Sequence, residues 1–84
     1  MPVLTTFLGI TIRMYFQQAE HNPPHIHVLY GEHAAAIAVR DGVVLDGYLP
    51  VHQLGQVQEW VVLHREELLD MWDTQQFHSI RPLD

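Results

Sequence analysis

The chain has 84 residues, 48% of them hydrophobic, which suffices for one domain with a single hydrophobic core. The chain has ten acidic residues and four basic ones, all arginine, and its formal net charge is −6. This charge disfavours a nucleic-acid partner, although a local phosphate site could still use one arginine. The lack of cysteine excludes disulfides and cysteine-ligated metals and favours a cytoplasmic location, and no stretch approaches the roughly 20 apolar residues of a membrane span.

The first predicted element is a strand over residues 7–16. Polar and apolar residues alternate there, as in a strand with one buried face. The apolar face comprises Ile10, Ile12, Met14 and Phe16, and the opposite face comprises Thr11, Arg13 and Tyr15. Residues 17–24 are polar and end in Pro-Pro, which cannot donate backbone hydrogen bonds, so a loop is predicted.

Two hairpins are predicted next. Residues 25–30 alternate, Gly31-Glu32 suits a tight turn, and residues 34–40 form the return strand. Asp41-Gly42 is a second turn signal, because these residues tolerate a positive φ, and residues 43–49 then close the meander.

The two-residue turns also predict a register for the first of these hairpins. Tyr30, Val28 and Ile26 should pair with His33, Ala35 and Ile37 on one face. On the other face, His25, His27 and Leu29 should pair with Ala38, Ala36 and Ala34. The small alanines beside the two histidines leave room for a packed helix or for a ligand.

Pro50 fits the first turn of a helix that runs from about Val51 to Trp72. Its apolar stripe is Leu54, Val57, Val61, His64, Leu68 and Met71 or Trp72. The tail, residues 73–84, should be either a short added strand or loosely ordered. The predicted fold is therefore α+β: one domain over residues 1–84, with a four-stranded antiparallel meander (about 7–49) and one C-terminal amphipathic helix packed on a sheet face.

The segment with the most chemical potential is His21-Asn22-Pro23-Pro24-His25-Ile26-His27. His25 and His27, two apart on a strand, point the same way, and a Pro-Pro bend can fold His21 back towards them. Three neutral imidazoles plus water form the ligand set of a hydrolytic zinc site, and they also suit nickel. A divalent transition metal on these three histidines is therefore one hypothesis. The simpler alternative is a polar strand face beside a proline-shaped loop.

The same histidines permit a reaction without metal. His25 and His27 could act as general acid and base while Arg13 holds a phosphate and Tyr15 contributes a hydroxyl, as in a small nuclease or other phosphodiester hydrolase. An ordinary sheet face explains Arg13 and Tyr15 more simply. His64 would reach His25 or His27 if the helix covers the histidine face, although a half-buried core histidine is the commoner explanation for it. Whether the protein is an enzyme stays open.

A set of short motifs supports a family assignment. They are Phe7-Leu8-Gly9-Ile10, Arg13-Met14-Tyr15-Phe16, the segment from His21 to Val28, Tyr30-Gly31-Glu32, and the helix segment 59–69. With these motifs the chain resembles the small bacterial family catalogued as domain of unknown function 4160. The loop residues 17–20 lengthen the segment before His21 relative to that pattern.

The resemblance implies a set of site residues but no established reaction. The matching positions are Arg13, Tyr15, His21, Asn22, His25, His27, Tyr30 and Gly31. It also implies a small protein partner encoded nearby, in a toxin–antitoxin-like pair. The leading hypothesis is a binding module that acts through its histidine-rich motif, with the acidic helix residues Glu59, Glu66, Glu67 and Asp70 as a docking face. A homodimer is a further expectation, because so short a chain buries only roughly 60% of its unfolded surface.

Overall fold

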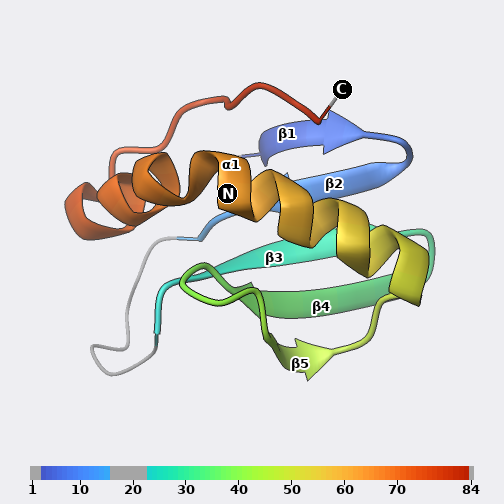
Figure 1. Cartoon of the computed structure of the whole chain (residues 1–84). Coiled ribbons are helices and arrows are strands. Elements are labelled where there is room, and N and C mark those ends of the chain that lie inside the picture. Colours follow the sequence, from blue (N-terminus) through green and yellow to red (C-terminus); the bar gives the residue numbers. More distant parts are fainter. Residues whose placement is uncertain (1–2, 16–22, 84) are drawn as a thin grey trace.

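The computed structural model describes residues 3–15 and 23–83, which form an antiparallel sheet and one helix (Figure 1). The elements are β1 (Val3–Phe7), β2 (Ile10–Arg13), β3 (His25–Tyr30), β4 (His33–Ala38), β5 (Val44–Gly47) and α1 (Val51–Thr74). The strands lie side by side in chain order, β1-β2-β3-β4-β5. The predicted α+β class and the C-terminal helix are confirmed, but the sheet has five strands where four were expected.

The fifth strand arises from a hairpin at Leu8-Gly9 that was predicted to be continuous strand. Both residues have positive φ, 50° for Leu8 and 79° for Gly9, and Phe7 pairs with Ile10 across the turn. A two-residue hairpin turn favours such values, and glycine adopts them readily. Leucine rarely does, so this turn gave no clear signal in the sequence.

The predicted register of β3 and β4 is confirmed at all six positions. His27 pairs with Ala36, flanked by His25 with Ala38 and Leu29 with Ala34. Gly31, at φ 56°, lies in the two-residue turn between the strands. Alternation then places His25 and His27 on one face of the sheet and the buried Ile26 and Val28 on the other.

The second hairpin is longer than predicted. Five residues, 39–43, connect β4 to β5. The Ala38 amide donates to the Val43 carbonyl (2.9 Å), and the Gly42 amide donates to the Ala38 carbonyl (2.9 Å). Val39 continues the core-facing alternation of Ala35 and Ile37, and its amide donates to the Pro24 carbonyl (2.9 Å). Arg65 Nε of α1 donates to the Val39 carbonyl (3.0 Å). β5 is shorter than the predicted 43–49, and a bulge interrupts its pairing with β4 between Ala36 and Ile37.

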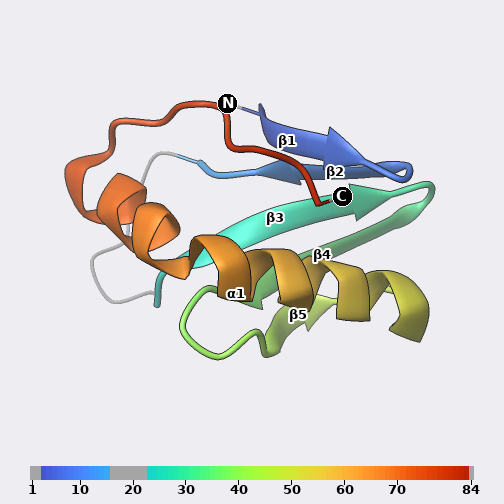
Figure 2. The same cartoon turned by 45° about the horizontal axis from the view of Figure 1, so that its top comes forward.

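The helix packs on a single face of the sheet. Its buried side chains are Val57, Trp60, Val61, Leu68 and Met71. They share the core with the buried residues of β1 to β4. Figures 1 and 2 show α1 lying across one side of the sheet, so no described helix or strand covers the side that carries His25 and His27. No helix within the described ranges is long and apolar enough to cross a membrane.

The tail forms no strand, but side-chain and backbone hydrogen bonds hold it in place. The Ile80 amide donates to the Leu4 carbonyl of β1 (2.8 Å), and Trp60 Nε1 donates to the Arg81 carbonyl (2.8 Å). Ile80 is buried. The helix ends two residues later than predicted, with Gln75 in the left-handed conformation at φ 59°.

Gly47 and Gly55 form a matched pair for testing this fold. Gly47 has φ 82°, and an added methyl group would overlap the carbonyl oxygen of Ala34. Gly55 lies exposed in α1 with free space around it. We expect Gly47→Ala to lower the free energy of unfolding by at least about 2 kcal/mol. Gly55→Ala should raise it by about 0.5–1 kcal/mol. Urea denaturation measures both, and a Gly47→Ala variant as stable as wild type would contradict the β4–β5 pairing.

Candidate functional site

A row of side chains crosses the open face of the sheet, by which we mean the face that α1 does not cover. Register partners place Arg13 beside His27, His27 beside Ala36, and Ala36 beside Asp46 on β2 to β5. Adjacent strands lie about 4.8 Å apart, so Arg13 and Asp46 stand at the ends of a row roughly 14 Å long. The structure thus brings Arg13 onto the same face as the two histidines, an arrangement that the metal-free hypothesis requires.

Four rings form a continuous series on and beside this face. The Tyr15 ring meets the His27 ring edge-on, with centroids 4.4 Å apart. His27 and His25 follow at 5.0 Å, and His25 lies 5.0 Å from Trp72. Tyr15, His25 and His27 therefore cluster as expected. Trp72 was assigned to the helix stripe, and its contact with His25 places it at the edge of the site.

The hydrogen bonds and surroundings of the two histidines define their chemistry. His25 Nδ1 lies 2.9 Å from the Pro23 carbonyl oxygen, which can only accept. His25 must therefore carry its proton on Nδ1, and Nε2 is left as an acceptor in the neutral ring. Burial lowers the pKa of His27 below its ordinary value of 6.5, and a positive charge on His25 lowers this pKa further. His27 is therefore a neutral imidazole at pH 7.

Two depressions meet on the open face and form one groove above β4. The first, about 250 Å³, is lined by Tyr15, His27, Val28, Leu29, Ala34, Ala35, Ala36, Asp46 and Gly47. The second, about 420 Å³, is lined by Pro23, His25, His27, Ala36, Leu45 and Asp46. Both share Ala36 as floor, with His27 and Asp46 on opposite walls. We call this the β4 groove. It exists because the side chains of β4 on this face are alanines.

Asp46 was not identified from the sequence. It reaches the groove because the five-residue loop and the bulge fix the register of β5, which sets Asp46 opposite Ala36. Its place inside a predicted strand gave no sign of this. A larger depression, about 520 Å³, lies elsewhere, at the kink of α1. Its lining is six consecutive residues, 62–67, so it is the hollow of a bend rather than a site assembled from several elements.

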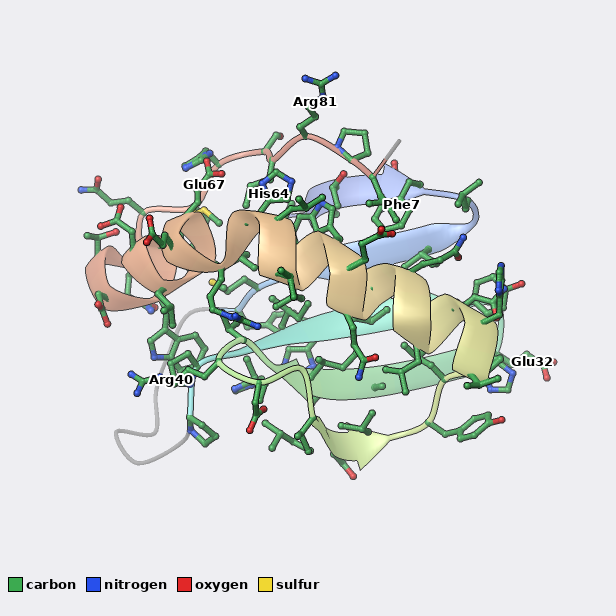
Figure 3. All side chains as sticks on the ribbon, viewed as in Figure 1. Phe7, Glu32, Arg40, His64, Glu67 and Arg81 are labelled. Carbon is green, nitrogen blue, oxygen red and sulfur yellow. The ribbon has the colours of Figure 1, made fainter. Side chains whose placement is uncertain are left out.

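Two predicted site residues lie away from the groove. His64 would reach His25 or His27 only if the helix covered the histidine face, and this condition is not met, because α1 covers the opposite face. The His64 ring instead lies 5.1 Å from Trp60, and its Nδ1 lies 3.8 Å from Glu67, which also meets His78 of the tail at 3.4 Å. Figure 3 shows His64 and Glu67 near the tail that carries Arg81. Tyr30 packs at the edge of the core, and its ring stacks on His33.

The proposed metal ligands are only partly described. His21 and Asn22 lie outside the described residues. Among those that are described, no group of three or more His, Asp or Glu side chains is arranged to hold a metal ion. A metal on His21, His25 and His27 therefore stays a prediction.

Comparison with known proteins gives a family but no relative of known activity. The family model described as "Domain of unknown function (DUF4160)" matches residues 9–73, which covers most of the sheet and nearly all of α1. No curated protein matches the chain, and no solved structure does.

The lowered pKa of His27 predicts how stability depends on pH. The unfolded chain takes up a proton on this residue near pH 6.5 while the folded chain resists it, so folding free energy is lost as pH falls below 6.5 towards the folded pKa. His27→Gln removes this contribution. We expect wild type to lose stability more steeply than the variant between pH 7.5 and pH 5.5. Uptake of one full proton on unfolding would change stability by about 1.4 kcal/mol per pH unit. The difference in slope between wild type and variant should stay below this value, because solvent screens the charge on a partly exposed ring.

Urea denaturation across this pH range, in EDTA, measures the difference. A variant that loses stability as steeply as wild type would show that His27 takes up its proton equally well in both states.

Proposed function

The chain belongs to the family described as Domain of unknown function (DUF4160), and from this premise we propose that it is a protein-binding module, one half of a toxin–antitoxin-like pair, that holds its partner on the open face of the sheet. The observation that carries the proposal is the β4 groove. The predicted site residues Tyr15, His25 and His27 line it, and no described helix or strand covers it.

The composition of this face supports protein binding. The cores of protein interfaces are enriched in aromatic residues and depleted of charge. The groove combines Tyr15 and two histidines with alanine and Leu29. Large apolar side chains continue the surface along the β5 edge, where Leu45 is 45% exposed and Tyr48 is 62% exposed.

The hydrolase alternative finds less support in the geometry. Such a mechanism needs a cation beside the acid and base to hold the phosphate. Arg13 shares the face but lines neither depression, and its Nε is buried without a hydrogen-bond partner among the described residues. The groove therefore places histidines and a carboxylate, rather than an arginine, around the space a ligand would occupy. Self-association and the docking role of the acidic helix face stay predictions.

Co-expression with the small protein encoded beside it tests the proposal. We expect the two proteins to elute together in size-exclusion chromatography at micromolar concentration. Ala36→Phe, which fills the groove floor with a residue that strands accept well, should weaken the complex at least tenfold, about 1.4 kcal/mol.

Val62→Phe on the exposed side of α1 is the matched control and should leave the complex intact. Separate elution of the wild-type proteins, or loss of binding in Val62→Phe but not in Ala36→Phe, would contradict a binding role for the open face. Circular dichroism establishes that both variants are folded.

A further inference from the structure

We propose that the β4 groove receives one arginine or lysine side chain from an extended basic segment of the partner. This inference rests on the proposed function and names the chemistry of the contact. It follows from the size of the groove, from the groups on its two walls, and from the charge around it.

The size of the groove suits one long side chain. Pockets for drug-sized molecules measure roughly 300–1,000 Å³ and enclose most of the ligand. The groove is made of two shallow depressions, and the smaller one, over Ala34 and Ala36, holds about 250 Å³ and is open to solvent. His27 on β3 and Asp46 on β5 flank Ala36 on β4. Two strand spacings separate them, so the groove is roughly 10 Å wide at the backbone. The aliphatic stem of an arginine or lysine can lie on Ala34 and Ala36 with its charged end at the rim.

The walls of the groove offer acceptors and ring faces. The Asp46 carboxylate has no hydrogen bond or ion pair with any described residue, so it is available to a ligand. On the other wall, His27 and Tyr15 lie ring to ring at 4.4 Å. A cation that contacts both an aromatic ring and a free carboxylate is stabilised by both. Arginine is stabilised most, because its planar guanidinium can stack on a ring while it donates hydrogen bonds to the carboxylate.

The charge around the groove favours a cation over an anion. Asp46 is the one aspartate, glutamate, lysine or arginine among the described residues that line either depression. Arg13 lies one strand beyond His27, on the far side from Asp46. The whole chain carries a formal charge of −6, which also attracts a basic segment. A phosphate or carboxylate would meet Asp46 without a lysine or arginine in the groove to balance it.

A peptide titration on the full-length, ¹⁵N-labelled protein tests the inference. The probe is acetyl-Thr-Ala-Arg-Ala-Thr-amide, and the control replaces arginine with citrulline, which has the same shape without the charge. We expect saturable amide shifts at Ala36 and Asp46 with a Kd in the millimolar range, and at least tenfold weaker binding of the citrulline peptide. Binding of the arginine peptide should weaken as salt is raised.

Two conservative variants make the test specific. Asp46→Asn should weaken the arginine peptide at least tenfold. Asp41→Asn, which removes a nearby charge but keeps the oxygen that accepts from the Val43 amide, should leave it unchanged. Equal binding of the citrulline peptide, equal binding by Asp46→Asn, or no saturable shift at about 10 mM peptide would each overturn the inference. So would a saturable response of these amides to zinc chloride without one to the peptide.

The same variants separate this inference from the proposed function. If Ala36→Phe disrupts the complex with the co-expressed partner while Asp46→Asn leaves its Kd unchanged, the open face binds the partner but the anchor is not cationic. If Ala36→Phe leaves the complex intact, the proposed function itself is wrong. Loss of affinity in both variants, with Asp41→Asn unaffected, is the result expected here.

Discussion

One helix can bury only one face of the sheet, and the rest of the structure depends on this constraint. Successive side chains of a strand point to opposite faces, so each residue that faces α1 has neighbours that face away from it. In β3, Ile26 and Val28 face the helix, and both are fully buried. His25 and His27 are thereby placed on the open face, next to Arg13 and Tyr15. The site is thus a consequence of how the core is assembled, and no separate element is needed to present it.

The open face acquires its shape from β4 and β5. The core-facing residues of β4 include Ala35 and Ile37, whereas alanines occupy its open side, so the surface sinks between β3 and β5. The bulge between Ala36 and Ile37 accompanies a register that sets Asp46 across the groove from His27.

The sequence predicted the features that depend on residues close together in the chain. The β3–β4 register followed from a two-residue glycine turn, and the shared face of His25 and His27 followed from alternation. The Leu8-Gly9 hairpin was missed because leucine gives no turn signal, and the five-residue loop was missed because Asp41-Gly42 is typical of a two-residue turn. Asp46 enters the site through the register of β5, and Trp72 enters it through the packing of the end of α1 beside His25, so the sequence did not mark them as site residues. The position of His64 depended on which face the helix covers.

The central claim is that the partner binds the open face, and chemical-shift mapping tests it most directly. The ¹⁵N-labelled chain would be compared free and in complex with the unlabelled co-expressed protein. A binding role for the open face predicts the largest amide shifts at His27, Ala34, Ala36 and Asp46, with small changes at Val62 and Leu63 on the outer side of α1. Shifts concentrated at Val62 and Leu63, with the groove residues unmoved, would contradict it.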